Sequence, residues 1–243
     1  MALPSHPHLQ VTQTHDVIHL TLDRVDQDNR MSNAMLEALR DTVLAAAGQC
    51  RLLVLRAQGP DFCLGRDMPP PPVGSNTSIE HILRDDAAPV LALYDALLAC
   101  PTPILCAVQG RTWGIGLVLM AMADITIASE EANFRLRELE RGIPPCLAMA
   151  PLLDRMPPQA LSHWVLTAGH VDVPRALSWG LIGETCPRAQ LESRVQELTD
   201  RLLTFPDTAV LAVKRYLNQA TRQDVRTAAQ EGAQMLAQVL STR

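Results

Sequence analysis

The chain has 243 residues, of which 47% are hydrophobic and 19% are charged, and its formal net charge is −5. A chain of this length forms one large domain or two small ones, and its composition excludes a disordered or coiled-coil protein. The acidic balance and the few aromatic residues argue against nucleic-acid binding, which depends on clustered basic side chains and stacking platforms. Lys214 is the only lysine, so lysine-based catalysis has one candidate at most.

The six cysteines form no CxxC pair and show no Cys/His spacing typical of a metal site. We therefore expect reduced thiols, no bound metal and a cytoplasmic protein. The N-terminus has no signal-peptide pattern, and the longest apolar run, 112–123, is shorter than the roughly 20 residues that a membrane span needs. No membrane association is expected.

Strands and helices alternate in the first part of the chain. Apolar patterns predict strands over 17–22, 52–55, 104–108 and 124–128. Helices are predicted after the N-cap residue Ser32, from residue 77 or 78 to about residue 100 with a kink at Pro89, and over 117–123. Repeated strand–helix units of this kind indicate an α/β fold with parallel strands.

The rest of the chain is predicted to be helical. Helices are expected over 158–169, 174–179, 191–203, 208–217 and 224–240. Gly169 is a suitable residue to end the first of these helices. Earlier in the chain, four consecutive prolines at 69–72 predict an extended surface loop of one domain rather than a linker between two.

Two turns that follow strands could present backbone N–H groups to a ligand. Gly110, Gly114 and Gly116 punctuate the first turn, in a pattern that is neither the dinucleotide G-x-G-x-x-G nor a P-loop. The second turn, 64–67, contains Gly65. The simple interpretation is close packing of a helix on a sheet, beside an ordinary loop. In the functional interpretation, amide hydrogens from both turns face one oxyanion, near the positive end of the following helix.

The mixed-charge segment 135–142 contains Glu138 and Glu140. Such segments are usually solvated surfaces. The two glutamates would share a face on a strand but would point far apart on a helix, so they form a weak acid/base pair. None of the seven histidines has metal-ligand spacing, and no G-x-S-x-G nucleophile motif is present.

Four segments, in order, resemble the motifs of the crotonase family, also called the enoyl-CoA hydratase/isomerase family. The segment 61–68, DFCLGRDM, is similar to F-[SC]-[AL]-G-x-D-[LM]. The segment 101–125 is similar to P-x-P-x-[IV]-A-x-[VI]-x-G-x-[AC]-x-G-x-G…D-[IV], and the segment 134–142 to F-x-x-P-E-x-x-x-G. The strand over 17–22, followed by Arg24 and Asn33-Ala34-Met35, looks like the opening of the family, so the resemblance covers most of the chain.

The resemblance implies an α/β fold, a crotonase-like spiral of stacked ββα units over 1–190, and a C-terminal helical trimerisation region over 191–243. A homotrimer or a dimer of trimers is expected. The substrate implied is an acyl-CoA thioester, with CoA as part of the substrate and no separate cofactor. By position, the N–H groups of Leu64 and Ile115 would form an oxyanion hole for the thioester enolate, and Glu138 would move the proton.

One departure from the family pattern bears on the reaction. Val118 stands where hydratases of the family carry the first of two glutamates, and Arg137 replaces the proline before Glu138. A single carboxylate is enough to move a proton between C2 and C4, so double-bond isomerisation is favoured and enoyl-CoA hydration is a close second. Decarboxylation stays open, and the alternative is a catalytically degenerate acyl-CoA-binding or partner-assembly protein on the same fold.

The surroundings of Glu138 give opposing expectations for its pKa. Apolar neighbours such as Val118 would raise it by desolvation, whereas Arg135, Arg137 and Arg141 would lower it if they point inward. Separate cations are needed for the phosphates of CoA. The candidates are Arg24, Arg66 and Lys214. The loop that begins with the four prolines is expected beside the acyl pocket.

Overall fold

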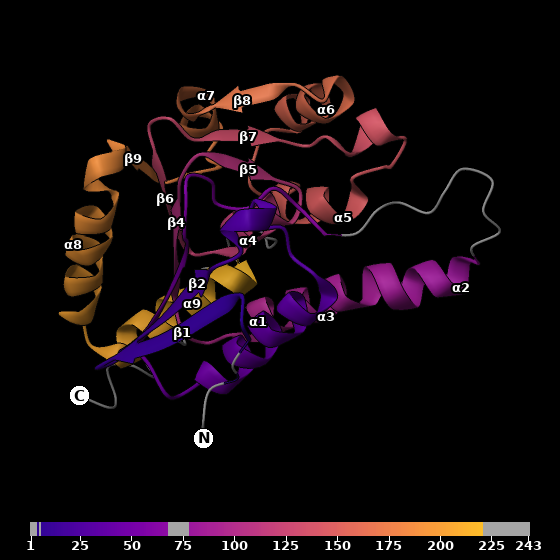
Figure 1. Cartoon of the computed structure of the whole chain (residues 1–243). Coiled ribbons are helices and arrows are strands. Elements are labelled where there is room, and N and C mark those ends of the chain that lie inside the picture. Colours follow the sequence, from indigo (N-terminus) through magenta and orange to yellow (C-terminus); the bar gives the residue numbers. More distant parts are fainter. Residues whose placement is uncertain (1–3, 5, 68–77, 221–243) are drawn as a thin grey trace.

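The computed structural model describes residues 4, 6–67 and 78–220. Six strands form the main sheet, in the order β1-β2-β3-β4-β6-β9 (Figure 1). They are β1 (Leu9–Thr14), β2 (Val17–Leu22), β3 (Leu52–Ala57), β4 (Ile104–Val108), β6 (Ile125–Ser129) and β9 (Glu184–Cys186). β1 is antiparallel to β2, and the other neighbours are parallel. The α/β class with parallel strands is therefore confirmed.

A second, smaller sheet lies beside the main one. It consists of β5 (Arg111–Trp113), β7 (Asn133–Arg135) and β8 (His170–Asp172). The chain passes from β4 to β5 and a helix, and then from β6 to β7, so it enters the two sheets alternately. This alternation is the spiral of ββα units that the family resemblance implied. The sequence patterns did not predict the short strands of this sheet, nor β1 and β9.

Helices cover both faces of the main sheet (Figure 1). The α-helices are α1 (Asn33–Ala46), α2 (Ile79–His81), α3 (Ala88–Ala99), α4 (Ile115–Met122), α5 (Cys146–Met149), α6 (Pro158–Thr167), α7 (Val173–Ser178), α8 (Leu191–Leu203) and α9 (Asp207–Ala220). Short helical turns are η1 (Val25–Gln27), η2 (Ile82–Ala87), η3 (Glu138–Arg141), η4 (Ala150–Leu152) and η5 (Arg188–Gln190). The predicted helix over 224–240 and the four-proline loop lie outside the described residues.

Local signals explain where several helices begin and end. The Ser32 side chain accepts a hydrogen bond from the Met35 N–H and caps α1, as predicted. The prediction that Gly169 ends α6 is wrong by one residue. Ala168 adopts the left-handed conformation at this end, with φ of 46°. Its N–H bonds to the Val165 carbonyl, which terminates the helix before the glycine.

The predicted kink at Pro89 is a π-helical turn. Pro89 has no N–H, and its ring would collide with the carbonyl of Asp85, four residues earlier, in a regular α-helix. The preceding segment η2 is wound as a wider π-helix, in which the Ala88 N–H donates to the Leu83 carbonyl. The long helix that begins after the N-cap Ser78 is therefore divided into α2, η2 and α3.

The main hydrophobic core lies between one face of the sheet and α1, α3 and α4. A second core lies on the opposite face, where Leu191 and Val195 of α8 pack against sheet residues such as Leu105 and Ile127. The region from residue 191 thus begins as a helix that covers this sheet. Within the described residues, no helix is long and apolar enough to cross a membrane.

Candidate active site

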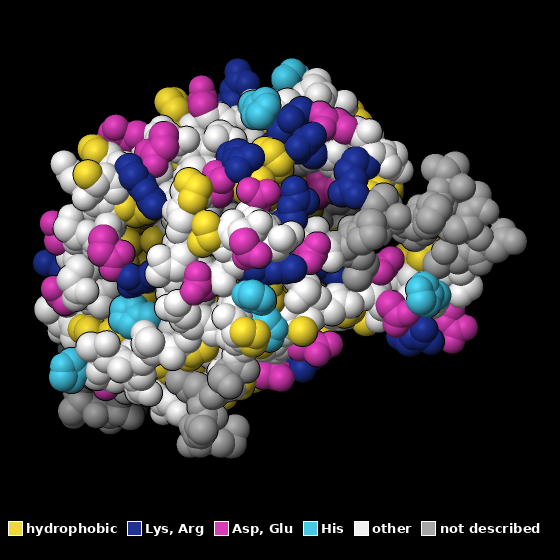
Figure 2. All heavy atoms as spheres, in the orientation of Figure 1, with side chains coloured by type: hydrophobic (Ala, Val, Ile, Leu, Met, Phe, Trp, Pro, Cys, Tyr) yellow, Lys and Arg dark blue, Asp and Glu magenta, His cyan; other side chains and the backbone are white. Residues whose placement is uncertain are grey.

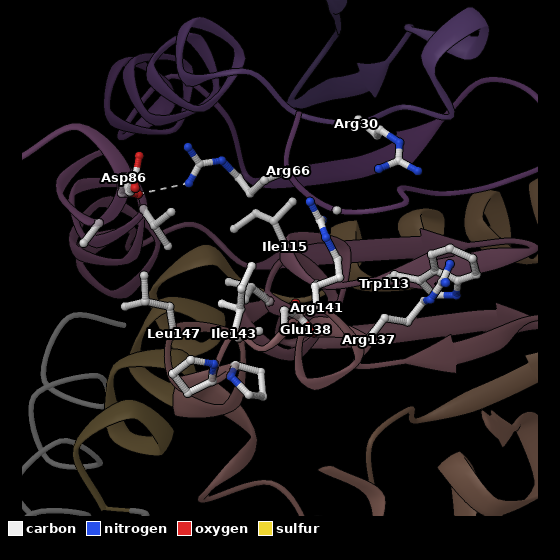
Figure 3. Close-up of a pocket in the computed structure, with 18 of the residues that line it drawn as sticks. Arg30, Arg66, Asp86, Trp113, Ile115, Arg137, Glu138, Arg141, Ile143 and Leu147 are labelled. Atoms are coloured by element: carbon white, nitrogen blue, oxygen red, sulfur yellow. Dashed lines mark hydrogen bonds between the residues drawn. The ribbon is translucent and has the colours of Figure 1, made fainter. Parts of the chain in front are cut away.

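A cavity of about 690 Å³ opens where α3, α4, η2 and η3 converge (Figure 3). Its volume lies in the range of small-molecule sites. Much of the lining is apolar and includes Val90, Tyr94, Val118, Ile143 and Leu147. The charged lining residues are Arg30, Arg66, Asp86, Arg137, Glu138 and Arg141. Leu64, Ile115 and Glu138, which the sequence singled out, all line this one cavity.

Two glycines bring the two predicted turns into contact. A Cβ atom at Gly116 would lie 2.7 Å from the Cys63 carbonyl oxygen, so α4 can approach the second turn only with glycine there. Gly114 has a φ of +52°, and a Cβ atom at this residue would lie 3.4 Å from the Gly65 Cα. The Trp113 N–H also donates to the Cys63 carbonyl at 2.9 Å. The glycine pattern therefore builds a close junction of two backbone turns.

The Ile115 amide has the properties expected of an anion donor. Ile115 is the first residue of α4, so its N–H has no acceptor within the helix. Among the described residues, no backbone hydrogen bond uses this N–H. The partial positive charge at the start of a helix adds to the attraction for a negative oxygen.

The Leu64 amide differs from the expectation. Its N–H donates to the Asp28 carbonyl at 3.1 Å and so is already engaged. The cause is a strained turn, because Asp28 and Asn29 both have left-handed backbones, with φ of 52° and 53°. The buried Asn29 side chain fixes this turn by donating to the carbonyls of Gln58 and Asp61, at 2.8 and 3.0 Å. In this structure the Leu64 N–H of the second turn is therefore engaged, and the next amide, of Gly65, faces the Cys63 sulfur.

Glu138 places a largely buried carboxyl group in the cavity lining. One carboxylate oxygen, Oε1, is 3.0 Å from the position that a Cβ atom on Gly114 would take, and the other, Oε2, is buried without a hydrogen-bond partner. Burial raises the pKa of Glu138, opposed by nearby backbone N–H groups and by the charge of Arg141. Desolvation therefore outweighs the arginines at this carboxyl. Figure 3 shows Glu138 close to Arg141, below Ile115.

The neighbouring glutamate has a different role. Glu140 accepts hydrogen bonds from Arg135 and Arg137, the latter at 3.0 Å, and the Arg137 bond lowers the pKa of Glu140. Glu140 does not line the cavity. The Arg137 guanidinium also lies over the Trp113 ring, 4.8 Å from its centroid. Glu138 and Glu140 therefore do not form an acid/base pair.

A second acid, Asp86, lines the cavity on the η2 side (Figure 3). No motif marks this residue, because it lies on a helical segment between the family signatures. Burial lowers the pKa of Arg66, and the charge of Asp86 opposes this shift. Val118 is 1% exposed and lines the cavity too, so the position of the missing glutamate is apolar.

The three arginine and lysine candidates for the CoA phosphates occupy different places. Lys214 lies in α9, is 5% exposed, and is bound to the Thr102 carbonyl and the Asp124 carboxylate, each at 2.8 Å. Arg24 forms an ion pair with Asp67 at 2.7 Å and does not line the cavity. Both cations are engaged in contacts within the protein, and their role toward the CoA phosphates stays a prediction.

Arg66 does line the cavity, but its guanidinium is bound to the protein. It donates to the Asp86 carbonyl at 3.1 Å and to the Asn33 side chain. Sequence reasoning missed Arg30 and assigned no ligand to Arg137 or Arg141, all of which line the cavity. Basic side chains gather on the face shown in Figure 2, around β5, β7 and α5. Among the described residues, no three His, Cys, Asp or Glu side chains are placed to hold a metal ion.

Taken together, the ββα spiral, the glycine-built amide turns and the buried acid define a crotonase-type fold and pocket. The family model for enoyl-CoA hydratase/isomerase matches residues 12–243. The chain belongs to the enoyl-CoA hydratase/isomerase family, an enzyme family.

Named relatives agree with this assignment. The chain is 30% identical to the "Probable enoyl-CoA hydratase" of Rhodobacter capsulatus over 81% of its own length and 75% of the relative. It is 31% identical to (7aS)-7a-methyl-1,5-dioxo-2,3,5,6,7,7a-hexahydro-1H-indene-carboxyl-CoA hydrolase of Mycobacterium tuberculosis, over 87% and 84% of the two chains. A Thermobifida fusca protein of the enoyl-CoA hydratase type, solved in complex with acetoacetyl-CoA, superposes with a TM-score of 0.85. It is 25% identical, over 97% of this chain and 96% of that one.

Proposed function

We propose that this chain is an acyl-CoA enzyme that stabilises a thioester enolate and isomerises the double bond of an enoyl-CoA, with Glu138 as the proton shuttle. The observation that carries the proposal is the buried, unpartnered Glu138 oxygen beside the junction of the two amide turns. A carboxyl group with a raised pKa is a better general base near neutral pH than an exposed one.

The reaction follows from this arrangement. The Ile115 N–H donates to the thioester carbonyl oxygen of a 3-enoyl-CoA. The Glu138 carboxylate removes a proton from C2, the C2 electron pair delocalises onto that oxygen, and Glu138 returns the proton at C4 to give the 2-enoyl-CoA. The second donor comes from the Leu64–Gly65 turn. The substrate would draw either the Leu64 N–H from the Asp28 carbonyl or the Gly65 N–H from the Cys63 sulfur. Preorganised donors of this kind lower such a barrier by about 3 kcal/mol each.

The apolar Val118 supports isomerisation over hydration. Hydration needs a water molecule held and deprotonated beside the double bond, and Val118 offers it no polar contact. Isomerisation needs only a transferable proton and a dry pocket.

The test is turnover and proton exchange in Glu138→Gln. With a 3-enoyl-CoA in deuterated water, we expect solvent exchange at C2 and C4 and isomerisation to fall by about 10²–10⁴-fold, because the amide cannot accept the proton. Binding of CoA thioesters, followed by thermal shift, should persist. Val118→Glu should raise hydration of crotonyl-CoA relative to isomerisation. Full activity of Glu138→Gln would contradict the proposal.

Asp86 supports hydration as a second candidate function. Its side chain lines the same cavity from another wall and could hold the water that Val118 cannot. If hydration is the reaction, Asp86→Asn should reduce it strongly while leaving 3-enoyl-CoA isomerisation intact. Stabilisation by CoA thioesters without either reaction would indicate the binding protein instead.

We also propose that the protein is cytoplasmic and a homotrimer or a dimer of trimers, needing no cofactor besides the CoA of its substrate. Exposed apolar side chains on helices, such as Leu166 of α6 and Leu217 of α9, support self-association.

A further inference from the structure

The π-helical segment η2 is a wall of the cavity. Ile82, Asp86 and Ala87 of this segment line it, and Val90 and Tyr94 continue the wall along α3. Pro89 has no N–H, so this winding changes which hydrogen bonds the last backbone carbonyls of the segment can accept. The groups that donate to these carbonyls therefore help to set the position of the wall.

Two side chains from outside the segment take up these carbonyls. In a regular helix the Asp85 carbonyl would accept from residue 89, which is Pro89 and has no N–H. Instead it accepts from the Asn33 side-chain amide at 3.0 Å. The next carbonyl, of Asp86, accepts from the Arg66 guanidinium at 3.1 Å, drawn dashed in Figure 3. Arg66 also donates to the Asn33 side-chain oxygen, so the contacts form a closed set.

This set joins the wall to the amide turn. Arg66 directly follows Gly65, whose carbonyl accepts from the Met31 N–H at 3.0 Å, and the Asp67 N–H donates to the Met31 carbonyl at 2.9 Å. Asn33 is the first residue of α1, two residues after Met31. The backbone that carries the proposed oxyanion donors and the side chains that hold the wall are thus one connected unit.

The far end of the wall has its own attachment. The Tyr94 hydroxyl donates to the Leu147 carbonyl and ties α3 to α5 across the cavity. The wall is therefore held at α3 by Tyr94 and at η2 by the pair Asn33 and Arg66. If the η2 attachment were released, the η2 end of the wall would be free to move outward, while Tyr94 would keep the α3 end fixed.

We propose that Asn33 and Arg66 are positioning residues that hold the π-helical wall at a fixed distance from the amide turn and thereby exclude long or bulky acyl groups. This inference rests on the proposed acyl-CoA function. Neither residue has a chemical role in the proton transfer. Their effect is on which acyl group fits.

The experiment compares Asn33→Ala, Asn33→Asp and Arg84→Gln with the wild type. Asn33→Asp keeps an oxygen for Arg66 but loses the donor to the Asp85 carbonyl. Arg84 is a matched control, because it lies in the same segment and its exposed side chain bonds, among the described residues, to its near neighbours Asp85 and His81. The readouts are kcat/KM for straight-chain enoyl-CoAs of increasing length and amide hydrogen exchange of residues 79–99.

We expect the preference for short over long acyl chains to fall about tenfold in Asn33→Ala, the factor that corresponds to one hydrogen bond of ordinary strength. The same preference should fall in Asn33→Asp, and the backbone amides of residues 79–87 should exchange faster in both variants. Arg84→Gln should match the wild type. An unchanged chain-length preference in both Asn33 variants, or unchanged exchange at 79–87, would overturn the inference.

Failure of the proposed function is distinguishable from failure of this inference. If the wild type turns over no enoyl-CoA but binds saturated acyl-CoAs, the same chain-length comparison is made with dissociation constants. If the wild type binds no acyl-CoA at all, both proposals are wrong. If it binds and turns over acyl-CoAs while the Asn33 variants keep the wild-type preference, only the positioning role is wrong.

Discussion

At Glu138, burial and charge act in opposite directions, and burial prevails. The folded chain binds the proton of this carboxyl more tightly than the unfolded chain, because its pKa is raised. The stability that this group contributes is therefore complete below the ordinary glutamate pKa and is lost as pH rises through the raised value. The stability that Glu140 contributes depends on pH in the opposite direction, because Arg137 lowers the pKa of Glu140. That stability is present above the ordinary glutamate pKa and is lost as pH falls through the lowered value.

These opposite pKa shifts predict that the melting temperatures of two conservative variants change with pH in opposite directions relative to the wild type. Glu138→Gln should equal the wild type in melting temperature near about pH 4 and should exceed it increasingly toward about pH 8, because the variant avoids burying a charge. Glu140→Gln should be the less stable chain at neutral pH, with a deficit that shrinks as pH falls through the lowered pKa. Thermal unfolding of the three chains over this range is the measurement. Parallel curves for all three would contradict the assignment of the buried acid.

Motif spacing predicted part of the candidate site. The motifs correctly brought Leu64, Ile115 and Glu138 to one cavity, because each motif lies at the end of a strand or the start of a helix. They could not predict that the Leu64 N–H is engaged, since this depends on a left-handed turn at Asp28. Nor could they place Lys214, whose partner Asp124 is distant in sequence.

At the scale of elements, the close contact between α4 and the 64–67 turn depends on Gly116. Its backbone is not in the left-handed region, so the requirement for glycine is purely steric. We expect Gly116→Ala to push the turns apart and to lower kcat by about 10²-fold, the usual cost of misplacing reacting groups by about 1 Å. The loss of stability should be about 1–3 kcal/mol.

A control for this prediction lies elsewhere in the chain. A Cβ atom at Gly183 would make only an ordinary contact, 3.6 Å from the Thr126 carbonyl, and Gly183 does not line the cavity. Gly183→Ala should retain nearly full activity. Steady-state kinetics and denaturant unfolding of both variants test the pair. Equal activity of the two variants would show that the junction of the turns is not needed for catalysis.

The elements that the sequence located well carry a clear apolar pattern. The amphipathic helices α1 and α8 and the continuous apolar strand β4 begin at or near the predicted residues. The missed strands β5, β7 and β8 have three residues each, too few to show a period, and they are strands because they pair with one another. Tertiary pairing rather than local pattern defines the smaller sheet.

At the scale of the whole molecule, Lys214 links α9 to the N-terminal ends of β4 and β6, two interior strands of the main sheet. Its partner Asp124 precedes β6, and the same Asp124 oxygen also accepts from the Ile104 N–H at 2.7 Å. We expect Lys214→Met to destabilise the fold by about 3 kcal/mol, because it leaves a partly buried carboxylate without its counter-charge.

The double variant Lys214→Met/Asp124→Asn should recover part of this loss, since no unpaired charge remains. Arg194→Met is the control, because its ion pairs with Glu184 and Glu197 lie at the surface and their loss should change stability little. Urea unfolding of the four chains is the measurement. A loss in Lys214→Met no larger than that in Arg194→Met would show that α9 is held mainly by its apolar contacts.

The burial of Lys214 also bears on how the protein can be handled chemically. Thioesters acylate accessible, unprotonated amines, and this sequence has no second ε-amino group to offer them. Amine-directed labels and cross-linkers will therefore find no reactive side chain on the folded surface. Cys146, the exposed thiol among the six, is the natural attachment point. Pro145 and Leu147, the residues on either side of it, line the cavity, so we expect the emission of a fluorophore at Cys146 to respond to ligand entry.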